Sequence, residues 1–312
     1  MPLETFSAPS EPKAQETSVL VVGGGPVGLF LSLLLARAKI LVTLLESEEK
    51  LDDGPRAIAQ APFVLPELKK AGILEDVMAA SGDLKSTSAC FRRTSDKEIV
   101  AALPQVPGKP GSLILPQHVF SQIVFEHLQK HDNAEILMGH RLESLDNSAD
   151  KVKANVQTTS GETKTFSARY IIGADGGRSK VRTLSSIPFE GVTLPQQLVA
   201  TDVYYPFDSH GFSKGANFMA DPENYGLIGP IDSTGLWRVS FAVPSTFSSE
   251  EIEAAIPEKF EAMLPGPRPL KYTVHRIAPY KAQQLCAKTF KQGRTILLGD
   301  AAHCKLIVVF EN

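Results

Sequence analysis

A glycine-rich stretch near the N-terminus can bind the pyrophosphate of a dinucleotide. Residues 23–28 read GGGPVG and fit the pattern G-x-G-x-x-G. In this pattern Gly23 permits a tight turn, Gly25 lets the backbone approach a pyrophosphate, and Gly28 lets a helix pack close to the preceding strand. The helix that begins at Pro26 would offer unpaired N–H groups and its positive dipole end to the phosphates. The motif alone is weak, but a strand before it and a helix after it are the context it requires.

A carboxylate follows at the end of the next predicted strand. Glu46 comes directly after the apolar run Ile40–Leu45. At that position a carboxylate can accept hydrogen bonds from a ribose 2′-hydroxyl, and it disfavours a 2′-phosphate because like charges would meet. The alternative is an ordinary solvated glutamate at a strand end.

Two further motifs combine glycine with aspartate after a predicted strand. Residues 175–182 read DGGRSKVR and begin with Asp175, and residues 299–303 read GDAAH and include Gly299 and Asp300. Either motif alone would be read as an ordinary turn or strand end. The three motifs in one chain, each after a buried strand, are far more specific than any one of them.

The surrounding pattern predicts the elements that hold these motifs. Ser18–Val22, Pro26–Arg37 and Ile40–Leu45 read as strand, helix and strand, which make a βαβ unit. An amphipathic helix is predicted over Pro116–Asp132, followed by a β-meander between residues 135 and 168 and a buried strand at Tyr170–Ala174.

A second, more open sheet is predicted from residue 187 onward. Its strands are expected at 198–205, 217–220, 225–231 and 235–243, and a capping box at 248–251 opens a helix towards Leu264. Thr295–Leu298 then reads as a last buried strand. The predicted organisation is a disordered lead (1–17), a dinucleotide-binding domain (18–186), a sheet domain (187–285), a return to the first domain (286–303) and a tail (304–312).

With its three motifs in this order, the chain resembles the single-component FAD-dependent aromatic hydroxylases of the para-hydroxybenzoate hydroxylase fold. The resemblance covers about residues 18–303. More narrowly, the chain is similar to fungal members of the family that act on phenols and aromatic polyketides. It implies an α/β fold in which a Rossmann-like FAD-binding domain is interrupted by a mixed-sheet substrate domain. It also implies a monooxygenase that hydroxylates a small aromatic substrate with NAD(P)H and O2 through a C4a-hydroperoxyflavin.

The resemblance also assigns roles to individual residues. Asp300 would bind a ribitol hydroxyl of FAD, Asp175 belongs to a motif shared by FAD and the nicotinamide cofactor, Arg56 would lie near the pyrophosphate, and Gln117 near the ribityl–phosphate region. The predicted cofactor-binding residues are Gly23, Gly25, Pro26, Gly28, Glu46, Arg56, Gln117, Asp175, Gly299 and Asp300. The candidates for the wall of the substrate pocket are Asn217, Tyr225, Trp237 and Arg238. No catalytic residue is assigned.

The residues after 303 depart from the family pattern. That pattern continues with a proline, G-x-G-x-N and a long helix pointing at the flavin, whereas residues 304–312 read CKLIVVFEN. We expect that this tail is not native coding sequence and that intron read-through is its source. We also expect the chain with this tail to bind FAD weakly. The alternatives to a monooxygenase are an oxidase or dehydrogenase on the same scaffold, or a catalytically impaired FAD-binding fragment.

Composition narrows the remaining classes. A net charge of −3 gives no reason to expect a nucleic-acid partner or an anionic membrane surface. The apolar stretch Val19–Leu45 contains glycines and charges that a membrane-spanning helix would not carry. The three cysteines lie far apart, which fits a reducing compartment, and we expect a cytoplasmic protein. His127 and His131 are spaced as helical metal ligands, but without a third ligand no metal is expected.

Overall fold

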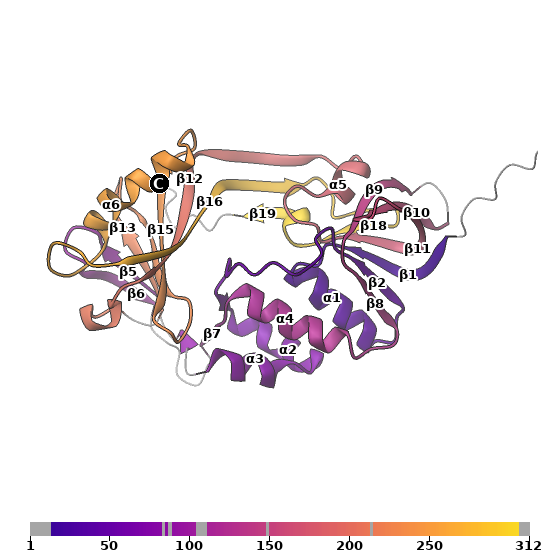
Figure 1. Cartoon of the computed structure of the whole chain (residues 1–312), viewed down its shortest axis with the longest axis horizontal. Coiled ribbons are helices and arrows are strands. Elements are labelled where there is room, and N and C mark those ends of the chain that lie inside the picture. The colour runs from indigo at the N-terminus through magenta and orange to yellow at the C-terminus, as the bar shows by residue number, and fades with distance from the viewer. Residues whose placement is uncertain are drawn as a thin grey trace, which may run out of the picture. The chain divides into compact units, whose positions relative to one another are not determined.

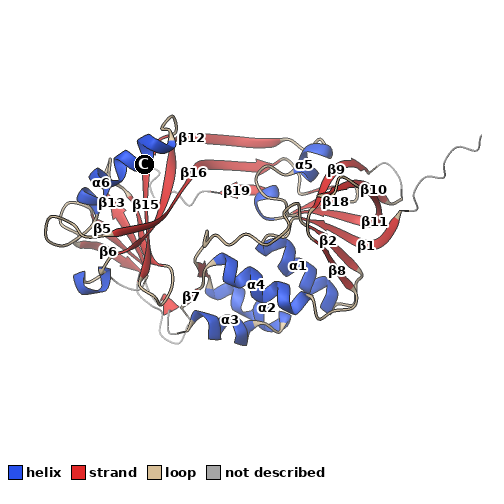
Figure 2. Ribbon diagram, viewed as in Figure 1, coloured by secondary structure: helices blue, strands red, loops and turns tan. Residues whose placement is uncertain are grey.

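The computed structural model describes residues 14–82, 85–86, 89–103, 111–147, 150–212 and 215–305 (Figures 1 and 2). The chain forms two compact units, each assembled from separate stretches of sequence. The first unit contains residues 1–51, 128–190 and 286–304. The second unit contains residues 52–127, 191–285 and 305–312.

A largely parallel sheet forms the first unit. Its strands run in the order β17-β18-β11-β1-β2-β8, and every neighbouring pair from β18 to β8 is parallel. Strands of this kind are buried on both faces, which explains why β2 is apolar and wholly enclosed. The strands are β1 (Gln15–Val22), β2 (Val42–Leu45), β8 (Ala134–Leu137), β11 (Thr163–Gly173), β17 (Lys291–Gln292) and β18 (Thr295–Leu297).

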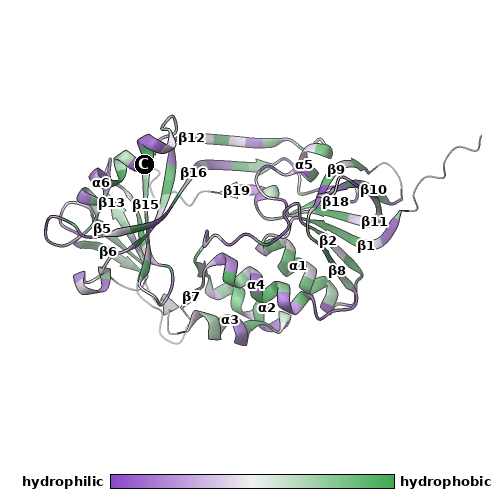
Figure 3. Ribbon diagram, in the orientation of Figure 1, coloured by the Kyte–Doolittle hydropathy of each residue, from purple (hydrophilic) through white to green (hydrophobic). Residues whose placement is uncertain are grey.

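Helix α1 (Pro26–Arg37) connects β1 to β2, as predicted. It is strongly hydrophobic along its length (Figure 3), and its buried residues include Leu29 and Leu33. The Asn133 side chain fixes its C-terminal end by donating to the carbonyls of Ala36 (3.0 Å) and Ile40 (2.9 Å). Among the described residues, no helix combines the length and the apolar character needed to cross a membrane.

An antiparallel pair, β9 (His140–Asp146) and β10 (Val152–Thr158), extends this sheet from the first half of β11. The predicted meander differs in two respects. Strand β8 lies beside β2 in parallel and outside the meander. The stretch Thr163–Gly173 is one strand where two were expected, because its first half pairs with β10 and residues Phe166–Gly173 pair with β1.

A mixed sheet forms the second unit, with strands in the order β16-β12-β15-β14-β13-β5-β6. The helix α6 (Ser249–Met263) covers one face. Its start is the predicted capping box, in which the Glu251 N–H donates to the Ser248 hydroxyl and the Ser248 N–H donates to the Glu251 carboxylate. The strands are β5 (Ala89–Arg93), β6 (Ile99–Leu103), β12 (Phe189–Tyr204), β13 (Ala216–Ala220), β14 (Gly226–Pro230), β15 (Leu236–Pro244) and β16 (Thr273–Ala287).

Shorter elements complete the chain. Strand β19 comprises His303–Lys305. Directly before it, the Ala302 carbonyl accepts a hydrogen bond from the Ala287 N–H at 2.7 Å. A small sheet of the second unit pairs β7 with both β3 and β4. These elements are α2 (Leu65–Ala71), α3 (Leu74–Ser81), α4 (Gln117–Leu128), α5 (Lys180–Leu184), η1 (Pro62–Val64), η2 (Phe207–His210), η3 (Gly299–Ala301), β3 (Ala59–Gln60), β4 (Lys85–Ser86) and β7 (Ser112–Ile114).

The units divide the chain differently from the domains predicted from the sequence. Residues 52–127, expected in the first domain, group with the second unit, because β5 pairs in parallel with β13. Strand β1 begins at Gln15, inside the stretch predicted to be a disordered lead, since Gln15–Thr17 pair with Phe166–Ala168. Of the predicted tail, Cys304 and Lys305 belong to β19, and residues 306–312 lie outside the described residues. The functional assignment of each domain stays a prediction.

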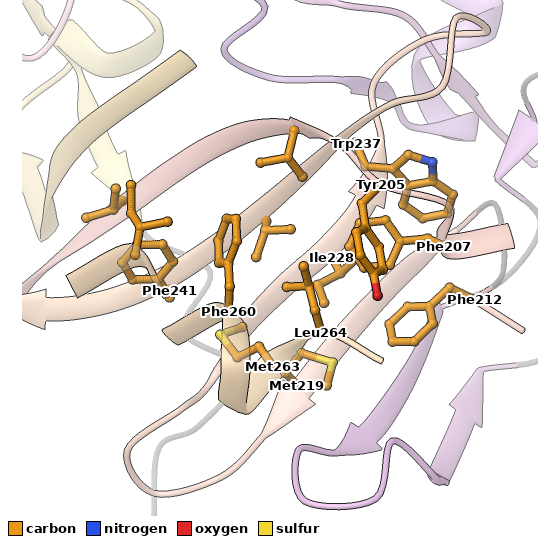
Figure 4. Close-up of a cluster of buried hydrophobic side chains, with 14 of the residues drawn as sticks. Tyr205, Phe207, Phe212, Met219, Ile228, Trp237, Phe241, Phe260, Met263 and Leu264 are labelled. Atoms are coloured by element: carbon orange, nitrogen blue, oxygen red, sulfur yellow. The ribbon is translucent and has the colours of Figure 1, made fainter. Parts of the chain in front are cut away.

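Aromatic side chains form the core of the second unit between α6 and the sheet (Figure 4). Phe260 of α6 is fully buried and meets the rings of Phe241 (6.3 Å between centroids) and Tyr272 (4.8 Å) edge to face. Such pairs stabilise beyond the area that they bury.

We expect Phe260→Ala to lower the free energy of unfolding by about 3–5 kcal/mol, because it leaves a cavity in this core. Urea denaturation followed by tryptophan fluorescence measures the change. Phe63→Ala is the matched control, since Phe63 is 81% exposed and its removal should change the stability by less than about 0.5 kcal/mol. Equal effects of the two substitutions would contradict the assigned core.

Candidate functional site

The carboxyl ends of the parallel strands bring the three motifs of the first unit to one edge of the sheet. Val22 lies opposite both Leu45 and Gly173, and Gly173 lies opposite Leu297. The loops that follow these residues start at the same level of the sheet. In open α/β sheets this edge is where ligands bind.

The glycine loop leaves the N-terminus of α1 open. Gly23 has φ +109°, and a Cβ on it would collide with the Ala174 carbonyl. A Cβ on Gly28 would collide with the Gly23 carbonyl, which explains the close packing of helix and strand. A Cβ on Gly25 would meet nothing within 4 Å, and Gly25 caps α1 without any side-chain hydrogen bond. An uncapped helix N-terminus facing open space fits a pyrophosphate.

Glu46 holds its carboxylate against this loop. One oxygen accepts from the Gly24 N–H at 2.6 Å. The other accepts from the Glu48 N–H (2.9 Å) and the Ser47 hydroxyl (3.0 Å). The negative charge is therefore fixed beside the glycine turn, where the sequence places a ribose acceptor, and the ribose contact itself stays a prediction.

Asp175 organises the second motif. One carboxylate oxygen accepts from the Ser179 hydroxyl at 2.5 Å, and the other accepts from the N–H groups of Lys180 (2.7 Å) and Val181 (3.1 Å). The Ser179 hydroxyl in turn accepts from the Arg182 N–H at 3.0 Å and caps α5. These bonds explain why aspartate and serine occur at this spacing. A direct contact between Asp175 and a cofactor stays a prediction.

Arg182 ties the second motif to the third, a role that sequence analysis missed. Its guanidinium donates to the carbonyls of Gly177 (2.7 Å) and Ala301 (2.9 Å). It also lies 3.7 Å from the centroid of the Phe189 ring. Burial lowers the pKa of Arg182, and the nearby Asp175 carboxylate opposes that change. The only signal in the sequence was its place as the last residue of the motif.

Asp300 presents a free carboxylate beside α1. A Cβ on Gly299, whose φ is +57°, would lie 3.1 Å from a methyl group of Val27 in the first turn of α1. Asp300 is exposed, and within the described parts of the chain its carboxylate has no hydrogen-bond partner. Such an acceptor suits a ligand hydroxyl.

Arg56 and Gln117 lie together in the second unit. The Gln117 N–H, at the start of α4, donates to the carbonyls of Pro55 (3.1 Å) and Ala57 (2.8 Å), the two neighbours of Arg56. Sequence analysis placed both residues at the cofactor from the resemblance alone. The structure brings them together, and their contact with a cofactor stays a prediction.

The loop that carries Arg56 is held by charged groups. The Arg56 side chain donates to Asp52, and its backbone has φ +30°, in the left-handed region that favours glycine. Asp52 also accepts from the Gly54 N–H at 2.8 Å. Burial raises the pKa of Asp52, but Gly54, Arg56 and Arg276 together hold that pKa below its usual value. Backbone strain of this kind persists only where surrounding contacts impose it.

Two of the four pocket candidates have packing roles. Asn217 is 0% exposed and bonds to the Arg92 guanidinium (3.0 Å) and the carbonyls of Gly215 (3.1 Å) and Ile228 (3.2 Å). Trp237 is 3% exposed and packs in the core of Figure 4, 4.9 Å from the Phe207 ring. Both side chains point to the face of the sheet that α6 covers, so we leave them out of the substrate site.

Arg238 and Tyr225 stay as candidates. The Nε and one terminal nitrogen of Arg238 both donate to Asp202, at 2.9 and 2.8 Å, and the other terminal nitrogen donates to the Arg56 carbonyl. Asp202 is 1% exposed, and sequence analysis missed it because its partner lies on another strand. Tyr225 is half-buried, and burial raises the pKa of its phenol.

Comparison with known proteins identifies the family to which this chain belongs. The chain belongs to the family described as "FAD binding domain", whose profile matches residues 16–308. It is 38% identical over 291 residues to para-nitrophenol 4-monooxygenase of Pseudomonas sp. (strain WBC-3), covering 91% of this chain and 71% of the relative. It is 35% identical to 6-hydroxy-3-succinoylpyridine 3-monooxygenase of Pseudomonas putida (strain DSM 28022 / S16), over 91% of this chain and 72% of the relative.

A solved structure agrees with these relatives. The p-nitrophenol 4-monooxygenase of Pseudomonas putida DLL-E4 superposes with a TM-score of 0.87 at 36% identity, covering 93% of this chain and 74% of that protein. The fold class and the resemblance to FAD-dependent aromatic hydroxylases are thereby confirmed.

We expect Gly25→Ala and Gly28→Ala to separate ligand binding from folding. Because a methyl group at Gly25 meets nothing in the protein, the apoprotein should keep its Tm while FAD affinity falls about tenfold or more from crowding of the pyrophosphate. Gly28→Ala should lower the free energy of unfolding by about 2 kcal/mol or more. FAD titration and thermal unfolding of both variants test this, and a stability loss in Gly25→Ala would refute the open loop.

The thiol of Cys304 lies close to Asp300 and Arg182 in the first unit. It lies 3.5 Å from the Asp300 carbonyl, and burial raises its pKa, as does Asp300, while Arg182 lowers it. Because only the thiolate reacts, its alkylation in a Cys286→Ser background should rise with pH through a midpoint above the ordinary pKa of a cysteine thiol. Asp300→Asn should move that midpoint down. An unchanged midpoint would show that Cys304 does not sense Asp300.

Proposed function

We propose that this FAD-dependent monooxygenase hydroxylates a single phenolic ring at the expense of NAD(P)H and O2. The balanced reaction converts the phenol, NAD(P)H, H⁺ and O2 into the dihydroxylated ring, NAD(P)⁺ and H2O. The observation that carries the proposal is the open N-terminus of α1 with the free Asp300 carboxylate beside it. FAD, when bound, supplies the redox chemistry that activates oxygen.

The first unit offers a complete set of groups for the dinucleotide. The α1 N–H groups would bind the pyrophosphate, Glu46 a ribose hydroxyl and Asp300 a ribitol hydroxyl. The chemistry of these groups fits FAD, because backbone donors meet its phosphates and carboxylate acceptors meet its hydroxyls. Arg56 and Gln117 are further candidates, from the resemblance described above.

The names of the relatives favour one ring position. In para-nitrophenol, carbon 4 lies para to the hydroxyl, and in a 6-hydroxypyridine, carbon 3 lies para to the hydroxyl. Both monooxygenases are thus named for the position para to a ring oxygen. That carbon gains electron density when the phenol ionises, so it is suited to attack by an electrophilic oxygen. We propose the same relation for the substrate of this chain.

Oxygen incorporation tests the proposal. Purified chain 1–312 is supplied with FAD, its bound flavin is measured from the visible spectrum, and NAD(P)H and 4-nitrophenol are added under ¹⁸O2. In 4-nitrophenol the carbon para to the hydroxyl carries the nitro group, so 4-nitrophenol, NAD(P)H, H⁺ and O2 give 1,4-benzoquinone, nitrous acid, NAD(P)⁺ and H2O. We expect phenol-dependent NAD(P)H consumption, one nitrite released per turnover and one labelled oxygen in the quinone. Substrate oxidation without label would establish the oxidase or dehydrogenase alternative. Stoichiometric flavin without turnover on any phenol would establish a non-catalytic FAD-binding protein.

A further inference from the structure

One face of the second unit's sheet is apolar although α6 covers the other. Met219 of β13 and Ile228 of β14 point into the core beneath α6. Because side chains alternate along a strand, Phe218 and Leu227 point to the opposite face. A sheet with one face on a core usually carries polar residues on the other. Here the outward residues of β13 are Ala216, Phe218 and Ala220, and all three are only half-buried.

A continuous row of side chains crosses five strands on this face. Phe91 lies opposite Phe218, which lies opposite Leu227, and the row continues through Ser240 to Ala200. The Phe91 and Phe218 rings are stacked, with centroids 5.3 Å apart and planes 24° apart. Side chains shrink along the row from two phenyl rings to a methyl group. The row therefore places two stacked aromatic rings next to small side chains on the same face of the sheet.

Polar groups adjoin the small end of the row. Arg238 lies two residues before Ser240 on the same strand and therefore on the same face. Its neighbours on the adjacent strands are Asp202 and Gly229. Within the part of the chain that is described, the Ser240 hydroxyl meets no hydrogen-bond partner. Arg238 uses three of its five N–H groups on Asp202 and the Arg56 carbonyl. A hydroxyl without a partner and a guanidinium with spare N–H groups can both donate to a substrate oxygen.

We propose that Phe218, supported by Phe91, stacks on the ring of the substrate and makes this face selective for one flat ring whose oxygen reaches Ser240 and Arg238. This inference rests on the proposed function and names the residues that would recognise the phenol. Apolar rings beside N–H and O–H donors suit a phenol, whereas a polypeptide partner would gain little from the row of small residues.

Equilibrium dialysis of 4-nitrophenol against the FAD-supplemented chain tests the role of Phe218. Loss of a stacked ring should raise the Kd of Phe218→Leu about three- to tenfold. In steady-state assays the KM should rise by the same factor with kcat unchanged, because stacking holds substrate and transition state alike. Phe218→Tyr keeps the ring and should keep the affinity. Met219→Leu, the adjacent core-facing residue, is the matched control and should bind as the wild type does.

The outcomes separate this inference from the function on which it depends. The stacking role would be overturned if the wild type binds 4-nitrophenol and both Phe218→Leu and Phe91→Leu bind it with the same Kd. The proposed function would then remain intact. A wild type that binds no phenol would overturn both. If the wild type sediments as a dimer and Phe218→Leu as a monomer with an unchanged Kd, the face binds a second copy instead.

Discussion

The architecture of the first unit depends on a close approach between two stretches of backbone. Gly23 passes so near the Ala174 carbonyl that no other residue fits, and Gly28 passes even nearer the Gly23 carbonyl. These contacts place the end of β1, the start of α1 and the loop after β11 at one edge of the sheet. Parallel pairing then adds Glu46 and Gly299 at the same level. The cofactor site that we propose is a consequence of this backbone geometry.

A second level of organisation comes from charged side chains that bond to backbone. Arg182 joins the loops after β11 and β18 by donating to a carbonyl of each. Asp175 fixes the start of α5, and Asp52 and Arg238 hold the strained residue Arg56 in the second unit. Each of these groups is placed to hold a loop in one conformation. Preorganised loops reduce the cost of binding a ligand.

The sequence predicted the elements that local rules control. Helix α1, the capping box of α6 and the glycine turn were found because backbone freedom, capping and periodicity act within a few residues. Residues 52–127 were misplaced because β5 joins β13 across more than a hundred residues, and no local pattern encodes that pairing. Arg182 was missed for the same reason, since its acceptor on Ala301 lies 119 residues away.

The substrate candidates show where residue type misleads. Asn217 and Trp237 were chosen because a polar group and a large ring suit a phenol, yet both face the core, where Arg92 and Phe207 satisfy them. Strand register decides which face a residue occupies, and a shift by one residue exchanges the faces. Phe218 adjoins Asn217 in the chain, and only the alternation observed in the structure places it on the face opposite α6.

Hydrogen exchange with and without FAD tests the central claim most directly, that three separate loops of the first unit form one binding site. The account predicts that FAD slows exchange together in peptides covering residues 23–30, 175–182 and 299–303, with the same midpoint in FAD concentration for all three. Protection of only one of these loops, or of none, would contradict it.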